Sequence, residues 1–273
     1  MKTEATIIDG IKCYAPELAY SNNDYNENDF KKLFEIEEQN FWFKARNRVI
    51  KTLLENYSKD VSGSFLEIGC GTGFVLKGLS KFSNLRLTGA EIYLEGLKYA
   101  KQRLPEVEFL QLDATSIPFR EQYDYIGAFD VLEHITEDEN VMRNVYKALK
   151  YGGMFFISVP QHMFMWSIED DAACHKRRYS KVEILSKLKK AGFEIKYHTS
   201  FVFSLFPLMM VSRFIKKNKQ TSDLKEDRFN EELKLNPLIN KAFELILRID
   251  ELLIRIGVRL PFGGSLIVVA KKL

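Results

Sequence analysis

The sequence predicts an α/β protein with a doubly wound, mostly parallel sheet, and three observations favour this fold class. Short apolar segments alternate with segments in which apolar residues recur at helical spacing. Three glycines stand directly between the first strand-like segment and the first helix-like segment. The chain has 273 residues, of which 46% are hydrophobic, so it is long enough to bury both faces of such a sheet.

Seven segments have the length and composition of strands that are buried inside a sheet. Each is short and rich in apolar residues, and each is followed by a glycine, a proline or a polar residue. In order along the chain they are 65–68, 85–90, 107–110, 123–129, 154–159, 193–197 and 266–270.

Four segments between these strands predict helices that pack on the sheet, at 74–82, 94–104, 136–150 and 180–192. Two of them begin with the capping-box pattern, in which a hydroxyl residue and an acid three positions later cap the helix reciprocally. These pairs are Thr136 with Glu139 and Ser180 with Glu183. Glycines at 152 and 153 predict the end of the third helix.

Two regions fall outside the alternation of strands and helices. Residues 1–28 are polar and aperiodic, which predicts an irregular arm, whereas 30–57 has the spacing of one or two helices. Residues 200–262 interrupt the alternation before the last strand. The predicted parts are therefore an N-terminal arm with helices (1–58), the α/β domain (59–199), a helical insertion or lid (200–262) and the final strand (263–273).

The insertion contains an amphipathic helix at 238–258. Its charged face carries two acid–base pairs at i,i+4, Glu244/Arg248 and Glu251/Arg255. Its predicted buried face comprises Ile239, Ala242, Phe243, Ile246, Ile249, Leu253 and Ile256.

Composition and charge exclude several classes of protein. The formal net charge of +3 is too small to indicate nucleic-acid binding. The three cysteines form no CxxC pair, so we expect neither a disulfide framework nor a cysteine-bound zinc. The first ten residues lack the apolar segment of a secretion signal, and the most hydrophobic run, 201–211, is too short to span a bilayer. We therefore expect a soluble, cytoplasmic protein.

A glycine-rich turn follows the first strand and carries the strongest functional signal. Gly69, Gly71 and Gly73 allow the backbone to turn sharply and approach a ligand closely, and the next helix points its free N–H groups at that ligand. In a dinucleotide fingerprint the third glycine would come one position later, where this chain has Phe74. The short turn favours a nucleoside with an amino-acid tail and disfavours NAD.

Polar residues follow the next strands at the same edge of the sheet. A carboxylate at Glu91 can accept both hydroxyls of a ribose, and Asp113 with the backbone of Ala114 can contact an adenine edge. Phe129 ends the fourth strand, where its ring can cover the base. Open α/β sheets bind their ligands at this edge, the carboxyl ends of the strands.

Together these motifs resemble a known family. The ExGxGxG pattern at 67–73, Glu91, the stretch QLDATSIPF at 111–119 and FDVLEHI at 129–135 resemble class I S-adenosylmethionine-dependent methyltransferases. The similarity is greatest to the branch that contains quinone-biosynthesis and many small-molecule and sugar methyltransferases. It covers about 60–200 and the last strand, and implies a seven-stranded sheet with an antiparallel final strand.

The resemblance implies S-adenosylmethionine as the methyl donor and assigns residues to its parts. Glu67 and the three glycines would surround the methionine moiety. Glu91 and Ile92 would lie at the ribose, although the family often has Asp at the first of these positions. Asp113 and Ala114 would contact the adenine.

The segment 40–46 resembles a helix that covers the cofactor pocket in this branch. Trp42 would then lie over the cofactor, and Arg46 would bind the methionine carboxylate. In the alternative interpretation the aromatic residues pack the helix on the sheet and Arg46 is solvated.

Methyl transfer depends mainly on positioning, but a hydroxyl acceptor benefits from a general base. His134, His162 and His175 follow strand ends and are the candidates for that base. Asp130, Glu133 and His134 also resemble a cluster proposed to hold a divalent cation, yet we expect no metal because the motif is short. The basic run 175–178 is either solvated surface, which we favour, or a clamp for an anion.

The sequence thus predicts a methyltransferase that acts on a small molecule, by O-methylation of a sugar, lipid-linked or quinone-like acceptor. A non-catalytic S-adenosylmethionine-binding module and an NAD-dependent oxidoreductase are the alternatives. Residues 201–219 combine apolar side chains with cations, which fits either peripheral membrane contact or ordinary core packing. We expect no nucleic-acid partner, and the sequence leaves the acceptor and the oligomeric state open.

Overall fold

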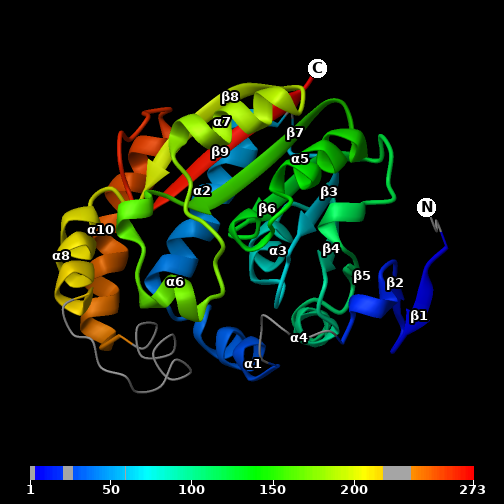
Figure 1. The fold of residues 1–273 in the computed structure, drawn as a ribbon, viewed down its shortest axis with the longest axis horizontal. Helices are drawn as coiled ribbons and strands as arrows, with labels where there is room; N and C mark the ends of the chain where they lie inside the picture. The colour runs from blue at the N-terminus through cyan, green and yellow to red at the C-terminus, as the bar shows by residue number, and fades with distance from the viewer. Residues whose placement is uncertain (1–3, 21–26, 59, 218–234) are drawn as a thin grey trace.

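A mixed sheet of nine strands forms the centre of the computed structural model, which describes residues 4–20, 27–58, 60–217 and 235–273 (Figure 1). The strands lie in the order β1-β2-β5-β4-β3-β6-β7-β9-β8. Their bounds are β1 Thr6–Ile8, β2 Ile11–Cys13, β3 Gly63–Ile68, β4 Leu85–Glu91, β5 Glu108–Gln111, β6 Tyr123–Phe129, β7 Leu149–Pro160, β8 Phe193–Phe201 and β9 Ser265–Lys272.

The seven predicted strands are all present, but the sheet has nine strands and not seven. The two additional strands, β1 and β2, come from the arm that we predicted to be irregular. β2 pairs in parallel with β5, and the side chain of Gln111 both accepts from the N–H of Ala15 (3.0 Å) and donates to its carbonyl (2.9 Å). Strands of three residues are too short to show periodicity, so only their partner in the sheet specifies them.

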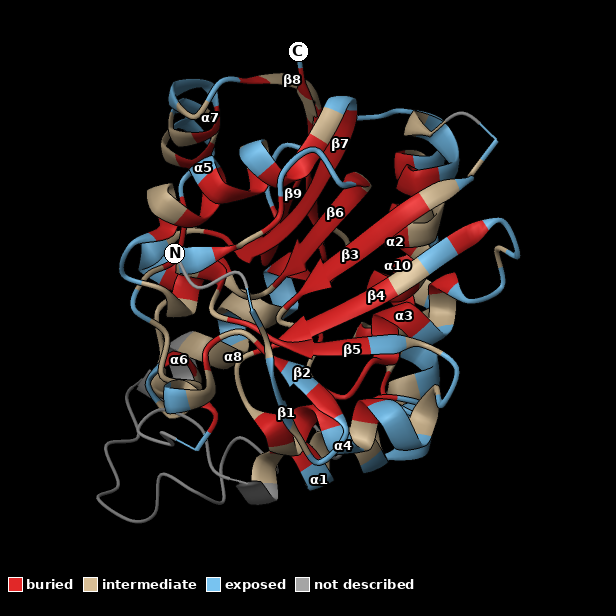
Figure 2. Cartoon of the chain, turned by 90° about the vertical axis from the view of Figure 1, so that its right-hand side faces the viewer, coloured by how far each residue is buried: buried red, intermediate tan, exposed pale blue. Residues whose placement is uncertain are grey.

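The direction of the strands confirms the predicted mixed sheet. β3 is parallel to β4 and β6, whereas β9 is antiparallel to both β7 and β8. The carboxyl ends of β3, β4, β5 and β6 therefore meet at one edge, and Figure 2 shows β3 and β4 as largely buried arrows that point to it. Open parallel sheets bind ligands at this edge.

Helices cover both faces of the sheet, as the doubly wound fold requires. Leu53, Leu76 and Leu97 pack in the apolar core on one face, and Val141 and Ile184 pack in the core on the other. The described α-helices are α1 Glu27–Ile36, α2 Phe41–Tyr57, α3 Phe74–Leu79, α4 Leu94–Arg103, α5 Asp138–Ala148, α6 Ile168–Ala172, α7 Lys181–Lys190, α8 Phe206–Lys217 and α10 Pro237–Arg255.

One of the two predicted helix starts is confirmed and the other is wrong. The hydroxyl of Ser180 accepts from the backbone N–H of Glu183, so it caps α7. Helix α5 instead begins at Asp138, and the residue before it, Glu137, makes no side-chain cap. The carboxylate of Asp138 accepts from the hydroxyl of buried Tyr179 (2.7 Å) and from Lys187 (2.7 Å), contacts that bring together segments far apart in sequence.

The amphipathic helix α10 exists, but its predicted buried face is right only in part, since Phe243, Ile246 and Leu253 pack against the core. Glu244 and Glu251 do not pair along their own helix at i,i+4, because both accept from Arg48 on α2 (2.9 and 2.6 Å). Residues Leu247 and Ile254 form the buried side, whereas Ile239, Ala242, Ile249 and Ile256 of the predicted buried face are exposed. The helix has two apolar sectors, and only its packing on α2 decides which one is covered.

Candidate cofactor and acceptor site

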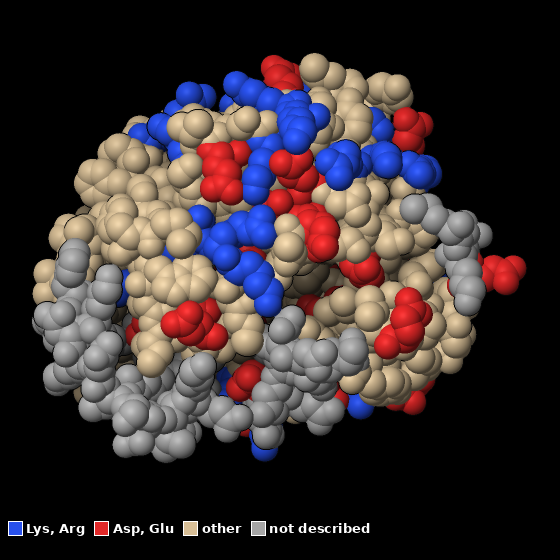
Figure 3. All heavy atoms as spheres, in the orientation of Figure 1, with Lys and Arg blue, Asp and Glu red and all other residues tan. Residues whose placement is uncertain are grey.

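The glycine-rich turn connects β3 to α3 and leaves space for a ligand. Gly69, Gly71 and Gly73 all have positive φ (65°, 50° and 75°), which side chains with a Cβ rarely adopt. A Cβ on Gly69 would lie 2.4 Å from a methyl carbon of Val131, whereas a Cβ on Gly71 would meet nothing within 4 Å. Gly71 therefore borders an open cradle. Figure 3 shows a hollow near the middle of the face that is seen in Figure 1.

Glu91 lies at the end of β4 and joins this strand to the glycine turn. Its Oε2 accepts from the backbone N–H of Gly71 (3.0 Å), and its Oε1 accepts from that of Ile92 (2.7 Å). Burial raises the pKa of this carboxyl, and the backbone N–H groups partly oppose that shift. A buried carboxylate therefore lies at the strand end with its oxygens at the turn, and its binding of ribose hydroxyls stays a prediction.

We expect Glu91→Ala to weaken binding of S-adenosylmethionine by about 1–3 kcal/mol, the range for losing a charged hydrogen-bond acceptor. Calorimetric titration measures the loss, and circular dichroism checks that the variant is folded. Unfolding of the variant would contradict the ribose role and make Glu91 a structural residue.

Glu67 in β3 supplies a second buried carboxylate behind the turn. It is 3% exposed, and its Oε2 has no hydrogen-bond partner among the described residues. Burial raises the pKa of Glu67 well above its ordinary value, although the guanidinium of Arg46 opposes this. An unpartnered buried oxygen calls for a donor, and the amino group of a bound methionine moiety fits that need.

Arg46 and Trp42 come from α2 and reach the same region. The guanidinium of Arg46 lies 4.6 Å from the centre of the Trp42 ring and forms an ion pair with Asp130 at the end of β6. Arg46 is 8% exposed and so is not solvated. The Nε of Arg46 has no hydrogen-bond partner among the described residues, and its guanidinium carries a positive charge. Both features favour binding of a methionine carboxylate, which stays a prediction.

A buried network that the sequence analysis missed holds the N-terminal helices to the turn. Arg103, at the end of α4, donates to Glu37 (2.8 Å) and to the backbone oxygen of Thr72 (2.9 Å) inside the glycine turn. The hydroxyl of Thr72 donates to the same carboxylate. Sequence spacing could not show this network, because its members lie on three separate elements.

The residues predicted to contact adenine have other partners in the structure. Asp113 caps its own turn, since its two oxygens accept from the N–H (2.8 Å) and the hydroxyl (2.6 Å) of Thr115. The contact of Asp113 and Ala114 with adenine therefore stays a prediction. Phe129 is buried in the core with its ring against Gly127, so its contacts do not support the predicted position over the base.

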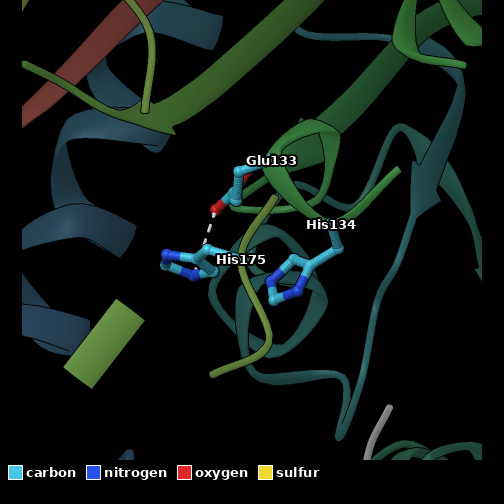
Figure 4. Close-up of side chains that lie close together, drawn as sticks. All are labelled: Glu133, His134 and His175. Atoms are coloured by element: carbon cyan, nitrogen blue, oxygen red, sulfur yellow. Dashed lines mark ion pairs between the residues drawn. The ribbon is translucent and has the colours of Figure 1, made fainter. Parts of the chain in front are cut away.

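Two of the three candidate histidines lie together beyond the end of β6 (Figure 4). The rings of His134 and His175 meet edge to face, with their centres 4.8 Å apart. Burial, with the charges of His175 and Lys176, lowers the pKa of His134 to about 3. His162 contacts Phe164 and Phe206 instead, and burial followed by the charge of Arg178 lowers its pKa.

His175 forms a dyad with Asp170. Its Nδ1 lies 2.8 Å from Asp170 Oδ1, the geometry in which a carboxylate orients an imidazole, and its Nε2 faces Glu133 Oε1 at 4.0 Å (Figure 4). Asp170 is 1% exposed and accepts from Arg178 (2.7 Å) and Arg213 (3.2 Å). Burial acts to raise the pKa of Asp170, but the hydrogen bonds from His175 and Arg178 outweigh it and the pKa falls.

Of the basic run 175–178, Lys176 is exposed as predicted, whereas the two arginines are paired with carboxylates. Arg178 is 5% exposed and paired with Asp170, and Arg177 pairs with Asp138 at 3.1 Å. These arginines fix the loop that carries His175. The expectation that the run is solvated is therefore wrong for both of them, because the buried carboxylates of Asp170 and Asp138 pair with their guanidinium groups.

Glu133, His134 and His175 also present three potential metal-ligating atoms within 4.8 Å of one another. This set differs from the predicted one, since Asp130 turns toward Arg46 and His175 takes its place. Imidazole nitrogens and a carboxylate suit zinc and similar ions. The expectation that the protein holds no metal therefore stays a prediction.

Glu133 is fully buried, and both of its carboxylate oxygens lack a hydrogen-bond partner among the described residues. Burial, with the charge of Asp130, raises its pKa well above the ordinary value. A carboxyl with a raised folded-state pKa binds its proton more tightly when folded. The charge of Glu133 therefore destabilises the fold at neutral pH, and stability increases as the pH falls through the folded pKa toward the unfolded one.

We therefore expect Glu133→Gln to raise the free energy of unfolding at pH 7 by about 1 kcal/mol or more and to reduce its pH dependence. Urea unfolding at pH 7 and at lower pH measures both quantities, with the exposed Glu106→Gln as a control. A less stable Glu133→Gln protein would contradict this expectation and indicate that the carboxylate has a partner, such as a metal ion, that a chelator should remove.

Comparison with known proteins matches residues 66–157 to the family described as "Methyltransferase domain". The chain is 26% identical over 157 residues to the ubiquinone biosynthesis O-methyltransferase of Escherichia coli, covering 52% of this chain and 65% of that protein. It is 25% identical over 158 residues to the malonyl-acyl-carrier-protein O-methyltransferase of Bacillus cereus, covering 52% and 59%. The match spans about three-fifths of the length of the curated relatives.

Solved structures show the same fold. The chain superposes on phosphoethanolamine N-methyltransferase 2 of Haemonchus contortus, which was solved in complex with S-adenosyl-L-methionine, with a TM-score of 0.59 and 17% identity. The alignment covers 92% of this chain and 58% of that one. At this identity the likeness shows the α/β fold alone.

Proposed function

The chain carries a class I, Rossmann-like methyltransferase domain whose cofactor is S-adenosylmethionine, and from this premise we propose that the protein is an enzyme that methylates a small molecule. The acceptor that we propose is a hydroxyl of a sugar, a lipid-linked molecule or a quinone-like ring. Two of the similar proteins are named as O-methyltransferases, which supports oxygen as the atom that is methylated.

The observation that carries the proposal is the cradle at the glycine turn. Gly71 borders open space, Glu91 directs its carboxylate to the turn, and Glu67 keeps an unpartnered buried oxygen. These groups match the parts of a nucleoside with an amino-acid tail, with Glu91 for the ribose and Glu67 for the amino group. Bound S-adenosylmethionine supplies a methyl group on a positively charged sulfur.

The second part of the proposal concerns the acceptor. We assign His175 as the base that takes the proton of the acceptor hydroxyl on its Nε2, with Asp170 as a positioning residue that accepts from Nδ1. Positioning of the acceptor supplies much of the remaining rate, because methyl transfer is an in-line displacement. Arg213 of α8 donates to Asp170 and to the backbone oxygen of Met165 (3.1 Å), which supports a role of the insertion as a lid beside this dyad.

Binding and turnover experiments separate the proposed function from its alternatives. Calorimetric titration should show binding of S-adenosylmethionine and S-adenosylhomocysteine but not of NAD. Release of S-adenosylhomocysteine on addition of a sugar, lipid-linked or quinone-like acceptor would establish the enzyme. Cofactor binding without release, across fractions of a whole-cell extract, would instead support a non-catalytic binding module.

A further inference from the structure

Helix α10 carries a row of apolar side chains that no described part of the chain covers. Leu238, Leu245, Ile249, Leu252 and Ile256 are between 55% and 79% exposed, and Ala242 between them is exposed as well. They follow one another at alternating steps of four and three residues, so they form a single stripe along the helix. Contiguous apolar surface of this kind marks an interaction site. We call these six residues the α10 stripe.

The stripe lies along the outside of the molecule. Figure 1 shows α10 at one side of the fold, and its opposite face packs on α2 through Leu247 and Ile254. With 19 residues the helix is about 28 Å long. Among the described residues no helix is long and apolar enough to cross a membrane, so the stripe is not part of a spanning segment.

A basic hollow adjoins the stripe on its α2 side. Four cations, Arg48 and Lys51 of α2 with Arg248 and Arg255 of α10, line a cavity of about 330 Å³, and Leu252 of the stripe forms part of its wall. Of the two carboxylates in the lining, Glu251 is already paired with Arg48 (2.6 Å) and Arg248 (3.2 Å). Among the described residues, neither Lys51 nor Arg255 forms a salt bridge. The hollow is therefore suited to an anion such as a phosphate.

We propose that the α10 stripe and the basic hollow together form a surface that docks on an anionic lipid bilayer. The stripe enters the boundary between headgroups and acyl chains, and the hollow receives a lipid phosphate. Apolar side chains on one helix face with cations beside them are the pattern of helices that lie in a membrane interface.

The charge of the flank favours a bilayer over a second copy of the chain. Lys241, Arg248 and Arg255 follow one another at intervals of seven residues and so form a basic row along one edge of the stripe. Two stripes packed antiparallel would set the basic row of one copy against that of the other, and this repulsion disfavours the pair. Anionic headgroups complement the same row.

The surface also revises where the chain would touch a membrane. Of the segment 201–219, residues 218–219 lie outside the described residues, and Phe201, Val202, Leu205 and Phe206 are buried. Only Pro207, Leu208 and Val211 of the run 201–211 are exposed. Most of the run is therefore buried or half-buried, and the row of exposed apolar side chains that we call the α10 stripe lies elsewhere, on α10.

Vesicle co-sedimentation tests the proposal with the full chain. Wild-type protein should bind vesicles of phosphatidylcholine mixed with phosphatidylglycerol, bind phosphatidylcholine alone weakly, and dissociate as salt is added. Arg248→Gln/Arg255→Gln should weaken binding to the anionic vesicles about 25-fold, because each cation contributes about fivefold. Leu245→Ser/Leu252→Ser should weaken it roughly tenfold or more for each leucine.

Matched variants on α7 control for surface changes in general. Val182→Ser removes an apolar side chain that is 76% exposed, and Lys181→Gln/Lys189→Gln removes two exposed cations. Both should bind vesicles as the wild type does. All variants should bind S-adenosylmethionine normally, which shows that they are folded and keeps this test separate from that of the proposed function.

Three results would overturn the proposal. The first is vesicle binding that survives the two leucine substitutions. The second is a wild-type dimer that Leu245→Ser/Leu252→Ser splits into monomers, because the stripe would then bind a second copy. The third is calorimetric binding of inorganic phosphate without any binding of vesicles, since the hollow would then be an ordinary anion site.

Discussion

Gly71→Val is expected to abolish detectable binding of S-adenosylmethionine. Its branched side chain would enter the open cradle, where a Cβ meets no protein atom within 4 Å, and would occupy the path of the ligand. The φ of 50° at this position adds strain of about 1–2 kcal/mol for a residue with a Cβ. Calorimetric titration measures the binding, and thermal unfolding followed by circular dichroism shows whether the variant is folded.

Gly257→Val is the matched control for strain alone. Gly257 also has a positive φ (84°), and a Cβ at this position would likewise meet no atom within 4 Å, but the residue lies just after α10 and away from the glycine turn. The variant should lose a similar amount of stability and keep its affinity for the cofactor. Unchanged affinity in Gly71→Val would contradict the assignment of the cradle.

His175→Asn is expected to slow methyl transfer by about 10²–10⁴-fold, the usual contribution of a general base. Asn can still donate to Asp170, so the loop and its arginines should stay in place. Cofactor affinity should be unchanged, because the dyad lies beyond the end of β6 and not in the glycine turn. Single-turnover formation of S-adenosylhomocysteine with a saturating acceptor measures the rate.

His198→Asn provides the comparison, since His198 is a half-buried histidine on β8 outside the cluster of Figure 4. This variant should transfer methyl groups at the wild-type rate. A normal rate in His175→Asn would rule out the base. If His175→Asn lowered only the affinity for S-adenosylmethionine and not the rate of methyl transfer, His175 would instead contact the cofactor.

Most of the sheet could be predicted from the sequence because its strands are buried. Segments such as 123–129 and 154–159 are nearly all apolar, and glycine, proline or polar residues mark their ends. The antiparallel last strand came from the family resemblance and is confirmed by the pairing of β9 with β7 and β8. The hairpin of β1 and β2 escaped prediction because its stability depends on β5 and Gln111 and not on its own residues.

The cofactor side of the site follows from local sequence, whereas the acceptor side does not. Gly71 lies in a turn and Glu91 at a strand end, and the α/β pattern determines both positions. In the structure the backbone N–H of Gly71 donates to Oε2 of Glu91 at 3.0 Å. Asp170 orients His175, but its local sequence predicts only a helix cap, because it stands three residues after Ser167 and caps α6 with it.

The sequence by itself therefore determined seven of the nine strands, the glycine turn and the carboxylates at the strand ends, since each depends on residues that are neighbours along the chain. Only the tertiary structure decided which histidines are in contact, which face of α10 is buried and which carboxylate pairs with each arginine. Those contacts join residues far apart in the chain, such as Arg48 with Glu251 and Arg46 with Asp130. Periodicity describes one element at a time, and only packing selects among the partners that each element offers.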